Sequence, residues 1–202
     1  MILTIDIGNT NIVLGCIDGD KTLFVERLST VRTKTELEYA IDIHRDEIEG
    51  GIISSVVPQI TTIVKLAVEK ILKKNVLVVG AGIKTGLNIR IDNPAQLGSD
   101  LVVDSVAAIA EYPAPLLIFD LGTANTVCVI DKNKNYIGGM IYPGIGVSLD
   151  SLTAHASQLG GISIEAPEHM IGKNTTECMK SGLIYSSAAA MDGIIDRLQE
   201  QL

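Results

Sequence analysis

One sequence pattern occurs twice in this chain: an apolar strand followed by Asp-x-Gly and then small polar residues. The first copy is Ile5-Asp6-Ile7-Gly8-Asn9-Thr10-Asn11, and the second is Phe119-Asp120-Leu121-Gly122-Thr123-Ala124-Asn125. In each copy the glycine permits a tight turn whose backbone N–H groups can approach an anion, while the aspartate carboxylate can hold a cation. The repeat therefore predicts two similar domains, each with one phosphate-binding turn.

Both copies continue into a second apolar strand that ends in a turn signal. The first runs from Ile12 to Ile17 and ends at Asp18-Gly19-Asp20, whereas the second runs from Thr126 to Ile130 and ends at Asp131-Lys132-Asn133-Lys134. Each copy is therefore predicted to be a β-hairpin with the phosphate turn at its tip.

The remaining elements are predicted from periodicity and capping residues. Strands are expected over 21–28, 51–57, 75–79, 116–120 and 136–141, and helices over 36–48, 58–74, 100–111, 147–157 and from about 175 onward. The alternation of strands and helices in the first half predicts an α/β class with a partly parallel sheet. Pro113 and Pro115 mark the expected boundary between a first domain, 1–113, and a second domain, 114–202.

Composition narrows the class of protein. With 202 residues, 47% of them hydrophobic, the chain is long enough to bury one large or two small cores. The formal net charge is −8 and the 16 Lys and Arg residues are scattered, which argues against nucleic-acid binding. Without a basic leader or a run of about 18 apolar residues, we expect a cytoplasmic protein with no membrane span. Cys16, Cys128 and Cys178 have neither disulfide nor metal spacing, and we expect them in the core.

Four motifs, taken in order, resemble the type III pantothenate kinase family of the actin/sugar-kinase/Hsp70 superfamily. They are Asp6–Asn11, Gly98-Ser99-Asp100 after Asn93-Pro94, Asp120–Asn125, and Gly172-Lys173-Asn174-Thr175. The resemblance implies two similar ribonuclease-H-like domains, with mixed β-sheets flanked by helices, that face each other across a nucleotide cleft. It also implies a second domain that is shortened at its C-terminus and lacks the usual adenosine motif.

The resemblance implies an activity as well: ATP-dependent phosphorylation of the hydroxyl group of pantothenate, the first step of coenzyme A biosynthesis. Asp100 would be the general base that accepts the hydroxyl proton. From the residues alone, Ser99-Asp100 is also a good helix-cap sequence, and the two roles are compatible. Because the family is dimeric, the resemblance implies a homodimer. The small-residue stretch from Leu183 to Ile195 is either core or a dimer interface.

Further site residues follow from the same resemblance. Asp6 would hold Mg²⁺ through water, and Asp120 would hold a monovalent cation, K⁺ or NH₄⁺. The residues expected to bind ATP phosphates are Gly8, Asn9, Thr10, Asn11, Gly122 and Thr123. The residues expected to bind pantothenate are Gly98, Ser99, Asp100, Leu101 and Thr175.

Two positions depart from the family pattern. The family commonly has Arg directly after the catalytic Asp and Tyr before the Asn-Pro pair, where this chain has Leu101 and Ile91. A lost guanidinium–carboxylate pair removes about 2–3 kcal/mol of substrate binding unless Arg90 or Lys173 replaces it. Two alternatives therefore stay open: a kinase for another small hydroxyl acceptor, and a non-catalytic nucleotide-binding or regulatory protein on the same fold.

Overall fold

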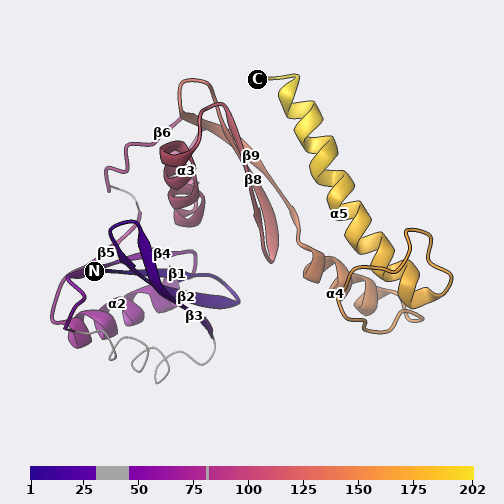
Figure 1. Ribbon diagram of the computed structural model, residues 1–202, viewed down its shortest axis with the longest axis horizontal. Helices are drawn as coiled ribbons and strands as arrows, with labels where there is room; N and C mark the ends of the chain where they lie inside the picture. Colours follow the sequence, from indigo (N-terminus) through magenta and orange to yellow (C-terminus); the bar gives the residue numbers. More distant parts are fainter. Residues whose placement is uncertain (31–45, 81) are drawn as a thin grey trace. The chain divides into compact units, whose positions relative to one another are not determined.

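The structure is a computed structural model that describes residues 1–30, 46–80 and 82–202. It divides into two compact units. Unit 1 contains Met1–Leu87 and Asp92–Ala107, and unit 2 contains Asn88–Ile91 and Ala108–Leu202. Each unit is built around one mixed β-sheet accompanied by helices (Figure 1). The predicted α/β class with two mixed sheets is confirmed.

Unit 1 has a five-stranded sheet in the order β3-β2-β1-β4-β5. Its elements are β1 (Ile2–Ile7), β2 (Asn11–Asp18), β3 (Lys21–Ser29), β4 (Gly50–Ser55), α2 (Pro58–Leu72) and β5 (Val76–Val78). Short turns join β1, β2 and β3, so these strands pair antiparallel, whereas α2 carries the chain across from β4 to a parallel β5. β1 pairs parallel with β4, which places the two halves of the sheet side by side.

Period-two alternation supplies the core of unit 1. Leu3, Ile5 and Ile7 of β1 are buried on one face of the sheet, together with alternate residues of β2. Pro58 begins α2, because the first turn of a helix needs no N–H at that position. The residues of α2 that repeat every four positions complete this core: Val64, Val68 and Leu72.

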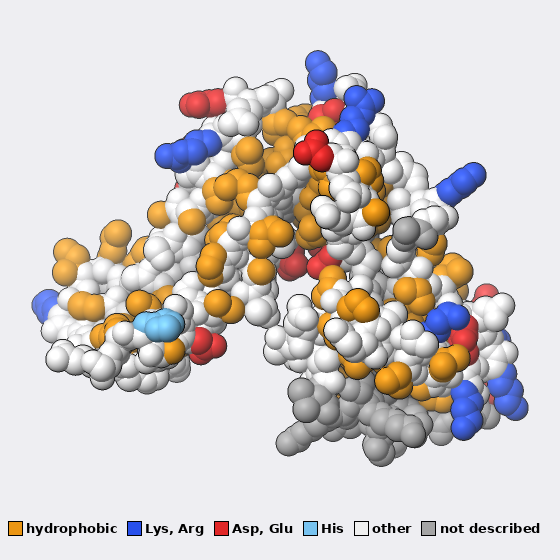
Figure 2. Space-filling view, turned by 180° about the vertical axis from the view of Figure 1, so that it is seen from behind, with side chains coloured by type: hydrophobic (Ala, Val, Ile, Leu, Met, Phe, Trp, Pro, Cys, Tyr) orange, Lys and Arg blue, Asp and Glu red, His pale blue; other side chains and the backbone are white. Residues whose placement is uncertain are grey.

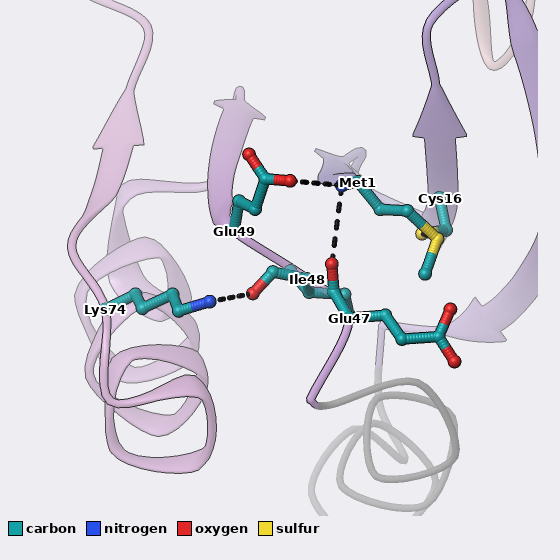
Figure 3. Close-up of polar contacts among 6 residues, drawn as sticks. All are labelled: Met1, Cys16, Glu47, Ile48, Glu49 and Lys74. Carbon is teal, nitrogen blue, oxygen red and sulfur yellow. Dashed lines mark hydrogen bonds and ion pairs between the residues drawn. The ribbon is translucent and has the colours of Figure 1, made fainter.

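The N-terminal ammonium group is attached to the segment that precedes β4 (Figure 3). It donates a hydrogen bond to the Glu47 carbonyl at 3.3 Å and pairs with the Glu49 carboxylate at 3.3 Å. The Lys74 ammonium, just beyond α2, donates to the Ile48 carbonyl of the same segment. These contacts hold Met1 where β1 can pair with β4 from its first residue, Ile2 opposite Gly50.

Unit 2 has a four-stranded sheet in the order β6-β9-β8-β7. The strands are β6 (Asn88–Ile89), β7 (Leu116–Leu121), β8 (Ala124–Ile130) and β9 (Asn135–Pro143). β7, β8 and β9 pair antiparallel, and β6 lies parallel to β9. The second predicted hairpin is confirmed, although β8 begins two residues before the expected Thr126 because Leu121 pairs with Asn125.

Four more helices complete the described part of the fold. The short 3₁₀ helix η1 (Pro94–Gln96) and α3 (Ser99–Glu111) lie between β6 and β7 in the chain, and α4 (Ile145–His155) and α5 (Thr175–Gln199) follow β9. Asn174 caps α5 as predicted, since its side-chain oxygen accepts a hydrogen bond from the Glu177 N–H at 2.9 Å. α4 and α5 pack together in unit 2 through Leu149, Met179 and Leu183.

Several predictions need correction or lie outside the described residues. Of the predicted helix 36–48, residues 36–45 are not described, and Asp46 and Glu47 form a turn. Cys16 and Cys128 are buried as expected, but Cys178 is exposed. Leu183 is buried, whereas the residues from 184 to 195 are half-buried or exposed, since the cluster between α4 and α5 takes its α5 members from the first turns of that helix. Among the described residues, that stretch is therefore not part of the buried core.

The surface is mixed in character. Figure 2 shows hydrophobic side chains over much of the face that it draws, interspersed with Lys, Arg, Asp and Glu side chains. No helix in the described ranges is long and apolar enough to cross a membrane.

Candidate active site

The first phosphate-binding turn, Gly8–Thr10 (loop 1), joins β1 to β2. The Gly8 N–H donates to the Asn11 carbonyl at 2.9 Å, which closes the turn. Thr30 stabilises the turn through two hydrogen bonds. Its hydroxyl donates to the Gly8 carbonyl at 2.9 Å, and its N–H donates to the Thr10 carbonyl at 3.1 Å. Asn9 and Thr10 are exposed and remain accessible to a ligand. Sequence reasoning missed Thr30, which lies 20 residues after Thr10 in a stretch that reads only as polar and connecting.

The second turn, Gly122–Thr123 (loop 2), joins β7 to β8 and is one residue shorter than loop 1. The end of β9 lies across it: the Gly144 N–H donates to the Thr123 carbonyl at 3.0 Å. A Cβ at Gly144 would overlap the Gly122 carbonyl oxygen, so only glycine fits there. Asp120, Gly122 and Thr123 are exposed. In the sequence, Pro143-Gly144 directly precedes the start of α4 at Ile145. Nothing in this pair of residues predicts the contact between Gly144 and loop 2.

The candidate base, Asp100, lies in the first turn of α3 and is half-buried. Its Oδ1 atom accepts a hydrogen bond from the Leu101 N–H at 2.8 Å. The carboxylate also folds back over Gly98, where an added Cβ would overlap Oδ1. Gly98 therefore provides the space in which this carboxylate lies.

Ser99 turns its hydroxyl inward, and its side chain is buried. The hydroxyl bonds to Ser54 and to both backbone groups of Ser55, at the end of β4. The backbone of Ser99, which is the part expected to contact pantothenate, forms the first residue of α3. The two β4 serines were not singled out in the sequence, because hydroxyl residues at a strand end are common and carry no spacing signal.

The structure brings together the site residues of unit 1 through strand pairing. Asp6 lies opposite Ser54, and Ile7 opposite Ser55, in the parallel ladder of β1 and β4. Loop 1, which follows β1, and Ser99, which bonds to the end of β4, are thus attached to neighbouring strand ends. Asp120, loop 2 and Thr175 belong to unit 2.

Thr175 is exposed at the first turn of α5 and lines a groove of about 1020 Å³ in unit 2. α4, α5 and the segment between them form this groove, and most of its lining is apolar, with Lys173 and Asn174 at the polar end. The turn before α5 is tightly packed, because a Cβ at Gly172 would overlap the backbone of Cys178.

An ion pair fastens the same segment to α5. The Lys180 ammonium lies 3.1 Å from the Glu165 carboxylate. Their hydrogen bond raises the pKa of Lys180 and lowers the pKa of Glu165. Both groups are therefore held in their charged forms around neutral pH.

The carboxylates beside the two turns are single groups rather than members of a cluster. Within the described parts of the chain, no group of three or more His, Cys, Asp or Glu side chains could hold a metal ion. Asp6 and Asp120 each end a strand next to a phosphate-binding turn and are exposed. This donor set fits Mg²⁺ bound by one carboxylate together with substrate phosphates, which is its usual mode in phosphoryl transfer.

Comparison with known proteins decides the family. Residues 2–197 match the family model of type III pantothenate kinase. This chain belongs to that family.

Relatives named type III pantothenate kinase are similar over the whole chain. One from an Exiguobacterium species is 43% identical over 211 residues, covering 100% of this chain and 83% of the relative. One from a Geobacillus species is 44% identical over 208 residues, covering 98% and 81%. A crystal structure described as a Baf family transcriptional activator from Campylobacter jejuni is 19% identical, with a TM-score of 0.57 over 95% of this chain and 78% of that one. At that identity the likeness supports the fold alone.

Proposed function

We propose that this chain phosphorylates the hydroxyl group of pantothenate with ATP, the first step of coenzyme A biosynthesis, and that Asp100 is its general base. The observation that carries the proposal is the family match over residues 2–197. The local geometry of Asp100 supports it, because the carboxylate is fixed at a helix start in the same unit as loop 1. ATP supplies the phosphoryl group when bound.

Asp100 has the right hydrogen bonding for proton transfer. Oδ1 is occupied by the Leu101 N–H, while Oδ2 accepts no hydrogen bond from the described residues. One oxygen therefore orients the carboxylate and the other is left to accept the proton of the acceptor hydroxyl. Gly98, Ser99 and Leu101 are the chain neighbours of this residue and would contact pantothenate, as would Thr175.

The two turns would bind the phosphates of ATP. Loop 1 offers the exposed side chains of Asn9 and Thr10, followed by Asn11, and loop 2 offers Gly122 and Thr123. We further propose that Asp6 holds Mg²⁺ through water and that Asp120 holds K⁺ or NH₄⁺, since each carboxylate adjoins a turn where phosphate charge accumulates. An Asp120→Asn variant should lose the activation that K⁺ gives over Na⁺ while keeping its thermal unfolding temperature.

We also propose that the enzyme is a cytoplasmic homodimer. The part of α5 from 184 to 195, which is half-buried or exposed, includes Ala188-Ala189-Ala190, Met191 and three isoleucines, and small side chains allow helices to approach closely. Sedimentation equilibrium of the wild type and of Ala189→Glu should show a dimer in the first and a monomer in the second. A monomeric wild type at micromolar concentration would refute this part of the proposal.

The activity is tested by coupled ADP release with ATP, Mg²⁺ and K⁺, with and without pantothenate. The key variant is Asp100→Asn, which is nearly isosteric but accepts no proton. Its matched control is Glu111→Gln, which removes an exposed carboxylate at the other end of α3. We expect pantothenate-dependent release that Asp100→Asn lowers to a small residual rate and Glu111→Gln retains.

Other outcomes separate the alternatives. Release that requires a different hydroxyl compound, and still requires Asp100, would indicate a kinase for another acceptor. ATP binding without release for any acceptor would indicate a non-catalytic nucleotide-binding protein.

A further inference from the structure

The hydroxyl group of Ser99 forms its hydrogen bonds outside its own helix. Ser99 is the first residue of α3, and the carbonyl of the preceding Gly98 accepts the first helical hydrogen bond, from the Val102 N–H at 3.1 Å. In this chain the Ser99 hydroxyl accepts from the Ser55 N–H at 2.9 Å and donates to the Ser55 carbonyl at 2.9 Å. The Ser54 hydroxyl lies 3.3 Å away as a further donor. The head of α3 is thus attached to the end of β4.

The end of β4 is itself fixed on both sides. On one side the Val56 N–H donates to the Ile7 carbonyl at 3.1 Å, which continues the pairing with β1 up to loop 1. On the other side the Ser55 hydroxyl bonds to Thr61 at 2.7 Å and accepts from the Val57 N–H at 3.1 Å, which ties the strand to α2. Ser55 is therefore a rigid anchor for whatever is attached to it.

Asp100 takes its position from the first turn of α3. Its Oδ1 atom bonds to the N–H of the next residue, so the carboxylate moves with the first turn of α3. That turn meets β4 through the buried Ser99 side chain directly before Asp100. A shift of the helix head relative to β4 would move the carboxylate relative to loop 1.

We propose that Ser99 is a positioning residue: by fastening α3 to Ser55 of β4, it sets the place of Asp100 relative to loop 1. The inference rests on the proposed function in one respect, the role of Asp100 as general base. It assigns the Ser99 side chain to the placement of that base rather than to contact with substrate.

The test compares Ser99→Ala with Ser105→Ala. Ser105 is a good control because it is also a buried serine of α3, but among the described residues its hydroxyl bonds to the Leu101 carbonyl of the same helix and to no other element. We expect Ser99→Ala to lower kcat on the order of tenfold to a hundredfold, with the KM for ATP nearly unchanged, because a small misplacement of a reacting group is costly. Ser105→Ala should keep the wild-type kcat. Thermal unfolding of both variants shows whether the loss of kcat exceeds what lost stability explains.

A double-mutant cycle separates positioning from general damage. If Ser99 acts through Asp100, adding Ser99→Ala to Asp100→Asn should cause no further loss of turnover. Equal losses in both backgrounds, or a Ser99→Ala kcat equal to that of Ser105→Ala, would overturn the inference. Wild-type turnover in Asp100→Asn alone would instead overturn the base role, and the inference with it.

A second variant covers the case in which Ser99→Ala does not fold. Ser99→Cys keeps a side chain of similar shape but replaces the hydroxyl with a thiol, a weak donor and acceptor, in both bonds to Ser55. A folded Ser99→Cys with lowered kcat would support the inference, and one with wild-type kcat would count against it.

Discussion

Replacing Gly98 with alanine should disable catalysis while leaving the fold intact. The backbone at Gly98 is not in the left-handed region, so alanine can adopt it without strain. The new methyl group, however, would overlap Oδ1 of Asp100 and would also approach Val56. The carboxylate is the only partner in this overlap that can move easily, so it should swing away and lose its bond to Leu101.

The expected magnitudes follow from this displacement. Restoring an ordinary contact requires a movement on the order of 1 Å, and misplacement of that size costs about 100-fold in kcat, or about 2.7 kcal/mol of activation free energy. The free energy of unfolding should change much less. Loss of the bond to Leu101 costs about 1 kcal/mol, and the reduced freedom of the unfolded chain returns about 0.4–1 kcal/mol.

The assay measures kcat for pantothenate-dependent ADP release together with the thermal unfolding temperature. Gly50→Ala is a matched control, because Gly50 lies in β4 with no atom within 4 Å of an added Cβ. It should keep the wild-type kcat. If Gly98→Ala is folded and turns over at the wild-type rate, the carboxylate of Asp100 does not need the position that the structure gives it, and its role as base would be refuted.

Three further changes probe the two loops and a turn. Thr30→Val removes the hydroxyl that supports the Gly8 carbonyl, so the KM for ATP should rise about fivefold, equivalent to about 1 kcal/mol; an unchanged KM would show that this support is dispensable. Gly144→Ala should push the backbone of loop 2 away and cost about 1–3 kcal/mol of stability as well as ATP affinity, measured by unfolding and titration against the unobstructed Gly146→Ala. Hydrogen bonds from the Asn135 side-chain amide and from the backbone N–H groups of Asn135 and Asn133 lower the pKa of Asp131. The ionised carboxylate therefore stabilises the fold above the ordinary aspartate pKa, and this contribution is lost as pH falls below about 4. Asp131→Ala should therefore show a shallower decline of unfolding free energy over that acidic range than the wild type, and parallel declines would contradict the assignment.

Local patterns in the sequence predicted most of the fold. Apolar alternation around Asp-x-Gly predicted both hairpins. A proline followed by apolar residues at helical spacing predicted α2. Boundaries shifted by one or two residues where pairing decided them, as at the start of β8, where the register of Leu121 with Asn125 extends the strand toward the turn. The burial of α5 from 184 to 195 was harder to predict, because a run of small apolar residues occurs both in cores and on helix surfaces.

The supports of the candidate site could not be read from the sequence, because they join residues far apart in it. Thr30 meets Gly8 from 22 positions away, and Ser99 meets Ser55 from 44 positions away. Neither pair has a spacing rule, since the pairing of β2 with β3 brings Thr30 to Gly8, and the tertiary position of α3 brings Ser99 to Ser55. The sequence points to the residues that carry the chemistry, whereas the contacts that hold them depend on the tertiary fold.

The small residues before Asp100 illustrate this difference. Read as a motif, Gly98-Ser99 suggests a backbone that lets a substrate approach closely. In the structure each residue has a second use directed at the carboxylate: Gly98 leaves the space that Oδ1 occupies, and Ser99 fastens the helix that carries it. A larger residue at 98 and a residue without a hydroxyl at 99 should therefore impair turnover by different routes. The first moves the carboxylate on a fixed helix, and the second loosens the helix beneath the carboxylate.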